Sequence, residues 1–140
     1  MDADELASNV AHAMLAAEGT GPAWGIRIEE ARHGYCRLSM EVRDHMLNGH
    51  GIAHGGMVFA LADTAFAYIC NGDNHRTVAA QASIVFLGSA QEGDVLIAEG
   101  EEVATVGRSG VTRVSVKTAD GRAVAEFTGY SRTIGGEIIP

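Results

Sequence analysis

The sequence lacks several features that would assign it to a common protein class. Basic residues are few: the chain has ten lysines and arginines against 18 aspartates and glutamates, which gives a formal net charge of -8. This balance disfavours a general nucleic-acid binder, which needs a basic face. No apolar run is long and glycine-poor enough to span a bilayer, and the acidic N-terminus lacks the basic start of a signal peptide. We therefore expect a cytoplasmic protein that binds neither nucleic acid nor membrane.

Cysteine and proline are both scarce. Cys36 and Cys70 are the only cysteines and form no CxxC pair, so two reduced core thiols are expected. With two prolines and no low-complexity run, the chain shows no linker. Its 140 residues fit one domain, 1–140.

Signatures of common cofactor and hydrolase sites are also missing. There is no GxxxxGK[ST] phosphate loop, and no GxSxG elbow of a serine hydrolase. Gly49-His50-Gly51 is not a dinucleotide fingerprint, because His54 stands where the third glycine should be. The spacing of His45, His50 and His54 matches no zinc motif. We expect no metal ion and no cofactor.

Hydrophobic periodicity and turn residues predict an α+β chain. Gly19 to Pro22 should end the first helix, and Asp120-Gly121 is the strongest hairpin signal. Hairpin-like links between the last four strands imply an antiparallel sheet, which must curl around the long apolar helix. The expected elements are a helix at 3–18, strands at about 24–31 and 35–42, a helix at 54–71, and strands at roughly 76–87, 94–106, 110–118 and 122–133.

The segment 54–72, HGGMVFALADTAFAYICNG, is apolar on every side and should form a buried helix. Asp63 is its only charged residue. A carboxylate in such a place loses much of its hydration. Either it meets a structural partner such as an arginine, or it is kept in a dry pocket as a general base or nucleophile. The residues alone leave both interpretations open.

His54-Gly55-Gly56 opens this helix. The first backbone amides of a helix have no hydrogen-bond partners within the helix, and glycine lets a ligand approach them closely. This turn can therefore bind the oxyanion of an acyl-transfer intermediate. The alternative interpretation is a plain tight turn before the helix. Gly55 and Asp63 are eight residues apart, or about 12 Å at ~1.5 Å per residue. They cannot reach one carbonyl within a single subunit. If both are catalytic, two such helices pack antiparallel in a dimer with two equivalent sites.

Two stretches carry a family resemblance, His45–Gly56 (HMLNGHGIAHGG) and Leu61–Ala67 (LADTAFA). The chain resembles the hotdog-fold thioesterases, most closely the phenylacetic-acid-degradation branch, over nearly its whole length. The resemblance implies a hotdog fold, a curved antiparallel sheet wrapped around one long central helix, plus an N-terminal helix. It also implies metal-free hydrolysis of acyl-CoA thioesters, particularly hydroxyphenylacetyl-CoA, by a homodimer that commonly assembles into a homotetramer.

The resemblance also implies roles for single residues. Asp63 matches the catalytic carboxylate, acting as general base or nucleophile, and the amide of Gly55 matches the donor that polarises the thioester carbonyl. Asn48 matches a polar residue that positions the thioester or the water. His54 is expected to give a supporting hydrogen bond, and Thr64 is a weaker catalytic candidate.

Contacts to the coenzyme are less specified by the sequence. We expect Gly56 and the turn Arg108-Ser109-Gly110 to contact the substrate. Any of Arg76, Arg108, Arg113 and Arg132 could pair with the coenzyme A phosphates, and Arg108 is the preferred candidate because of its turn. The chain departs from some relatives at Ala17, where they bring an asparagine into the site from the first helix.

Two other functions compete with hydrolysis. A hotdog dehydratase or hydratase usually carries a proline-rich loop with a histidine, but residues 43–60 contain no proline. A non-catalytic acyl-CoA-binding module has little use for a buried carboxylate at Asp63. Both patterns favour the thioesterase.

Overall fold

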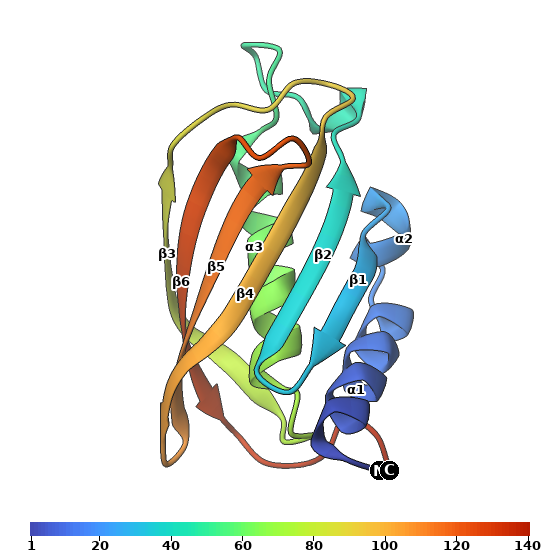
Figure 1. Ribbon diagram of the computed structural model, residues 1–140, viewed down its shortest axis with the longest axis vertical. Helices are drawn as coiled ribbons and strands as arrows, with labels where there is room; N and C mark the ends of the chain where they lie inside the picture. Colours follow the sequence, from blue (N-terminus) through green and yellow to red (C-terminus); the bar gives the residue numbers. More distant parts are fainter.

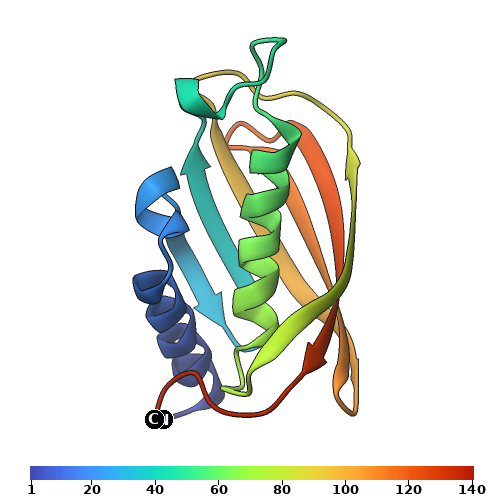
Figure 2. The same cartoon turned by 180° about the vertical axis from the view of Figure 1, so that it is seen from behind.

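The computed structural model describes residues 1–140 as a sheet wrapped around one helix (Figure 1). Helix α3 has 16 residues and runs along the concave side of the sheet, with α1 and α2 beside β1 (Figure 2). The elements are α1 (Ala3–Ala17), α2 (Thr20–Trp24), β1 (Arg27–Arg32), β2 (Tyr35–Glu41), the 3₁₀ turn η1 (Asp44–Met46), α3 (Gly55–Cys70), β3 (Thr77–Phe86), β4 (Val95–Val106), β5 (Ser109–Thr118) and β6 (Ala123–Thr133).

The six strands form one antiparallel sheet in the order β1-β2-β4-β5-β6-β3. This is the hotdog arrangement that the resemblance predicts. The hairpin at Asp120-Gly121 is confirmed, with the Gly121 amide donating to the Thr118 carbonyl oxygen at 2.9 Å. None of the helices is long and apolar enough to cross a membrane.

The expected hairpin link between β3 and β4 is wrong. Strand β3 pairs with β6 at the sheet edge, whereas β4 lies between β2 and β5. The connecting segment 87–94 crosses the end of the sheet, held by a 2.9 Å bond from the Ala53 amide to the Ala90 carbonyl and a 2.8 Å bond from Val42 to Asp94. Gly88 and the residues near it mark a loop, but a loop signal does not say which strand follows as a neighbour.

The expected strand start at residue 24 is also wrong, because residues 20–24 form the short helix α2. Pro22 lies in its first turn, where the backbone N–H would have no partner in the helix, so proline does not break it. Gly25 ends α2 in the left-handed region at φ 69°, and β1 begins at Arg27.

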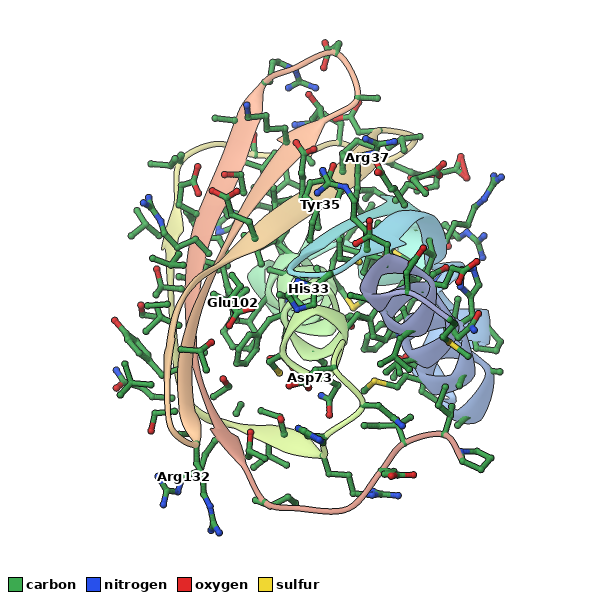
Figure 3. All side chains as sticks on the ribbon, turned by 60° about the horizontal axis from the view of Figure 1, so that its bottom comes forward. His33, Tyr35, Arg37, Asp73, Glu102 and Arg132 are labelled. Carbon is green, nitrogen blue, oxygen red and sulfur yellow. The ribbon has the colours of Figure 1, made fainter.

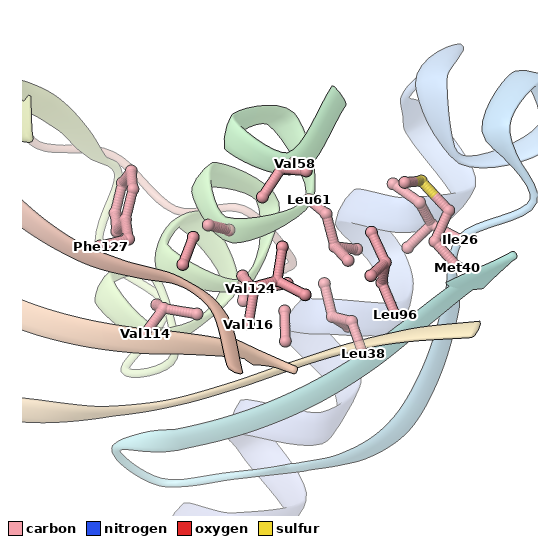
Figure 4. Close-up of a cluster of buried hydrophobic side chains, with 14 of the residues drawn as sticks. Ile26, Leu38, Met40, Val58, Leu61, Leu96, Val114, Val116, Val124 and Phe127 are labelled. Atoms are coloured by element: carbon pink, nitrogen blue, oxygen red, sulfur yellow. The ribbon is translucent and has the colours of Figure 1, made fainter. Parts of the chain in front are cut away.

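The core lies between α3 and the concave face of the sheet (Figure 4). Phe66 of α3 packs on Phe127 of β6 with ring centroids 5.7 Å apart. Gly129 makes room for Phe66, because a Cβ there would lie 2.7 Å from the ring. The inward side of β2 is buried as its alternation predicts: Cys36, Leu38 and Met40, and Val42 directly after the strand, are at 1% exposure or less.

One face of α3 is not covered by the chain, which corrects the expectation of a helix buried on every side. Ala60, Asp63, Thr64 and Ala67 are only half-buried. Beside them, edge strand β3 exposes apolar side chains, Phe86 at its end being 53% exposed. The apolar surface that the sequence assigned to a core is therefore divided between the core and an open face.

Candidate active site

Asp63 opens into a largely apolar cavity of about 630 Å³, which we call the Asp63 pocket. Its carboxylate makes no hydrogen bond or ion pair within the chain, and burial alone raises its pKa. Within this subunit, Asp63 therefore has no arginine partner, which is the contact that a purely structural role would require. The pocket is lined by Ala13, Met14, Ala17, Glu18, Thr20, Trp24, Ala60, Asp63, Thr64, Ala67, Tyr68, Asn71, Arg76, Thr77, Val78, Ile134 and Ile138.

The N-terminus of α3 leaves one amide free. His54 is the N-cap: its Nδ1 accepts from the Gly56 amide at 2.8 Å, and its carbonyl oxygen accepts from Met57 and Val58 at 2.9 and 3.2 Å. Of the first four amides, only that of Gly55 has no acceptor in the chain. It can therefore donate to a ligand without breaking an existing bond.

The two glycines thus differ in what they supply. A Cβ at Gly56 would lie 3.0 Å from Nδ1 of His54, so glycine at this position makes the cap possible. The backbone amide of Gly56 already donates to Nδ1 of His54. A contact between Gly56 and the substrate, as predicted from the sequence, would therefore use the space left by the absent side chain. For a Cβ at Gly55, the nearest atoms would belong to the ring of Phe86, at 3.1 Å.

The other predicted catalytic side chains occupy two places. The Oδ1 atom of Asn48 accepts from the backbone amides of His50 (2.9 Å) and Ile52 (3.3 Å), which shapes the loop before α3. The side-chain nitrogen Nδ2 of Asn48 has no hydrogen-bond partner in the chain. Thr64 lines the Asp63 pocket, but its hydroxyl donates to the Ala60 carbonyl oxygen at 2.7 Å, so only its oxygen lone pairs are free. Thr64 is therefore a potential acceptor beside Asp63.

A single chain does not assemble these groups into one centre. Helix α3 is continuous from Gly55 to Cys70, so the free amide and Asp63 stay about 12 Å apart along its axis. Asn48, His54 and Gly55 all lie outside the Asp63 pocket. Within one chain, the Gly55 amide and the Asp63 carboxylate therefore cannot act on the same carbonyl group.

The turn Arg108-Ser109-Gly110 lies at the other end of the sheet. It lines a polar cavity of about 180 Å³ near the C-terminal end of α3, together with the carboxylates of Asp73 and Glu102. Figure 3 shows His33, Asp73 and Glu102 around this end of the molecule. Thr77 borders both this cavity and the Asp63 pocket.

Sequence reasoning missed two polar residues of the Asp63 pocket, Glu18 and Tyr68. The Tyr68 hydroxyl donates to one carboxylate oxygen of Glu18, and the Thr20 hydroxyl donates to the other at 2.6 Å. A tyrosine within an apolar helix was the available signal, but its partner lies 50 residues away in the sequence. Ala17, noted as a departure from relatives, does line the same pocket.

Comparisons with known proteins identify the family of the chain. The Thioesterase superfamily matches residues 50–125. The chain is 39% identical over 128 residues to the acyl-coenzyme A thioesterase PaaI of Escherichia coli strain K12, covering 91% of each chain. The structure of E. coli PaaI, from the phenylacetic acid degradation operon, matches with a TM-score of 0.95 and 37% identity over 97% of this chain and 99% of that one.

A more distant solved structure carries the coenzyme. The thioesterase protein of Streptococcus pneumoniae with coenzyme A matches with a TM-score of 0.77 and 29% identity, over 80% of this chain and 90% of that one. The family match spans the whole of α3 with Asp63, the strands β3, β4 and β5, and the start of β6. The chain therefore belongs to the thioesterase superfamily, in the phenylacetic-acid-degradation branch of the hotdog-fold acyl-CoA thioesterases.

Proposed function

We propose that this thioesterase hydrolyses arylacetyl-CoA, in particular ring-hydroxylated phenylacetyl-CoA, to the free acid and coenzyme A. The observation that carries the proposal is an unpaired, half-buried Asp63 on the same continuous helix as the unpaired amide of Gly55. The Asp63 pocket, about 630 Å³ and mostly apolar, has the size and character of a site for an aromatic acyl group. The similarity to E. coli PaaI supports the same substrate class.

Each proposed group has a defined task. The thioester carbonyl oxygen accepts from the Gly55 amide, where the positive end of the helix dipole stabilises the developing oxyanion. Asp63 removes a proton from the attacking water or attacks the carbonyl carbon itself. When Asp63 acts as base, collapse of the tetrahedral intermediate gives the free acid and expels the coenzyme A thiolate, which takes up the proton that Asp63 removed. When Asp63 acts as nucleophile, the collapse expels the thiolate and leaves an acyl-Asp63 anhydride, which a water molecule then hydrolyses to the free acid. Asn48 positions the thioester or the water through its side-chain nitrogen Nδ2, which has no partner in the chain.

We propose that the site is completed by a second copy of the chain. The uncovered face of α3 and the exposed edge strand β3 give that copy an apolar surface to cover. Antiparallel packing of two α3 helices brings Gly55 of one chain to Asp63 of the other, which gives two sites per dimer. A homotetramer would then be a dimer of such dimers.

The coenzyme phosphates are assigned to the Arg108 turn. Inside the polar cavity, Asp73 and Glu102 would repel a phosphate, so we place the phosphates on the exposed outer side of Arg108. The pantetheine chain then leads from this turn toward the catalytic pair.

The decisive experiment removes the N–H donor of Gly55. Gly55→Pro deletes the backbone N–H at the first position of α3, where proline is favoured. The preceding residue, His54, has ψ 134°, which is the extended backbone that a residue before proline adopts, so the substitution should be tolerated. Loss of one oxyanion donor should lower kcat about 10²–10³-fold. Gly55→Ala keeps the N–H and is the matched control for the added Cβ beside Phe86.

Mixed dimers then test the shared site. Gly55→Pro chains and Asp63→Asn chains should each be inactive alone, while a verified mixed dimer retains one site with both native groups. Hydrolysis is followed by release of the coenzyme A thiol. Full activity of Gly55→Pro, or no recovery in the mixed dimers, would contradict the mechanism.

A further inference from the structure

The Asp63 pocket holds a second carboxylate, Glu18, that the proposed mechanism does not use. Glu18 caps the end of α1 and is held from two sides, by the hydroxyl of Tyr68 and by the hydroxyl of Thr20 at 2.6 Å. Each carboxylate oxygen accepts one of these bonds, so each keeps a lone pair for another donor. The group is thus oriented in advance without being saturated.

Tyr68 is the less accessible member of the pair, with 3% of its surface exposed. Burial first, and then the hydrogen bond to Glu18, raise the pKa of its phenol, so Tyr68 remains the donor in this pair. A phenylalanine would fill the same volume without a polar atom to satisfy. Glu18 is only half-buried, and its hydrogen bond to the buried Tyr68 hydroxyl is weak evidence for a role in stability, so the pair calls for a use other than packing.

The position of Tyr68 relative to Asp63 suggests that use. Both residues lie on α3 and line one pocket, and Tyr68 follows Asp63 by five residues, about 7.5 Å along the helix. An arylacetyl group with its carbonyl carbon near Asp63 spans a comparable length to its far ring positions. The only arginine lining the pocket, Arg76, donates through Nε to the Glu137 carbonyl oxygen at 3.2 Å and is thereby tied to the C-terminal tail.

We propose that Glu18 and Tyr68 determine specificity by binding a hydroxyl group at the distal end of the acyl group. The substrate hydroxyl donates to Glu18, and the Tyr68 oxygen can accept in turn. An acyl group without a hydroxyl would remove water from the Glu18 carboxylate and offer it no hydrogen-bond donor in return. A site built to hydrogen-bond a substrate hydroxyl rejects apolar analogues for this reason. This inference rests on the proposed function, because it takes the Asp63 pocket to be the acyl site.

The test measures kcat/KM for phenylacetyl-CoA and for its 3- and 4-hydroxy derivatives. The wild-type enzyme should prefer a hydroxylated substrate by about 10- to 100-fold, the range of a hydrogen bond to a charged group. Tyr68→Phe and Glu18→Gln should each reduce that ratio toward one, mainly by slowing the hydroxylated substrate. Met14→Leu alters the same pocket without touching its polar groups and should keep the wild-type ratio.

The outcomes separate this inference from the proposed function. An unchanged ratio in the variants, an equal loss on all three substrates, or no preference in the wild-type enzyme overturns the role of the pair. Those results leave the dependence on Asp63 and Gly55 intact. If Tyr68→Phe does not fold, Glu18→Gln decides alone, because Glu18 is half-exposed at a helix end.

Discussion

Replacing Asp63 by asparagine should inactivate the enzyme without destabilising it. The substitution keeps the shape of the side chain and removes only the carboxylate that can act as base or nucleophile. Within the chain, that carboxylate has no hydrogen-bond or ion-pair partner to lose. A residue kept for structure would behave in the opposite way, because breaking a buried pair is strongly destabilising.

The expected sizes follow from the environment of Asp63. Loss of a general base costs about 10²–10⁴-fold in kcat, or roughly 3–5 kcal/mol of transition-state stabilisation. Burial raises the pKa of Asp63 in the folded state above its value in the unfolded chain. Between the two values the folded state binds more protons, so the free energy of unfolding falls as pH rises through that window. Above it, the charged wild-type carboxylate is a stability cost that asparagine lacks.

The assay pairs thiol release from phenylacetyl-CoA with urea unfolding at two pH values. Asp63→Asn should be at least as stable as wild type near pH 7, and this difference should shrink below about pH 4, where the unfolded wild-type carboxyl is protonated too. Asp94→Asn is the control of opposite sign. Asp94 accepts from the Gln91 amide at 2.8 Å and pairs with Arg122 at 3.1 Å, and these contacts lower its pKa.

The control should lose stability at neutral pH, with that loss disappearing as pH falls through the lowered pKa of Asp94, and should keep its activity. An Asp63→Asn enzyme that turns over at the wild-type rate and unfolds more easily would refute the reasoning. Such a result would show that Asp63 serves the fold and that the base lies elsewhere.

Two further predictions concern the core. In a urea titration, Gly129→Ala should lower the free energy of unfolding by about 1–3 kcal/mol, because its Cβ would lie 2.7 Å from the Phe66 ring in a packed interior. Gly19→Ala is the control and should be nearly neutral, because no atom would lie within 4 Å of its Cβ. Burial raises the thiol pKa of Cys36 and of Cys70 to about 12, so the buried Cys36 should resist alkylation at pH 8 until the protein unfolds, and the half-buried Cys70 should react only slowly. Rapid labelling of the native protein, followed by mass spectrometry, would disprove the burial of those thiols.

The sequence by itself determined the features that depend on neighbouring residues. The helix through Asp63, its start at His54-Gly55-Gly56 and the Asp120-Gly121 turn all follow from periodicity, capping and turn chemistry, which act within a few residues. The 12 Å between Gly55 and Asp63 needed only the rise of a helix. An antiparallel sheet curled around the long helix followed from the order and character of the elements, and the family resemblance identified that arrangement as a hotdog fold.

Tertiary structure decided what depends on contacts distant in sequence. Strand β3 joins β6 and not β4, because pairing is set by packing around α3 and glycines in a loop carry no information about it. The open face beside Asp63 exists because one chain has too few elements to surround the helix. Glu18 meets Tyr68 only when α1 folds against α3, across 50 residues of sequence. A pattern of residues can thus identify the reacting groups, but the walls of their pocket come from packing between separate segments.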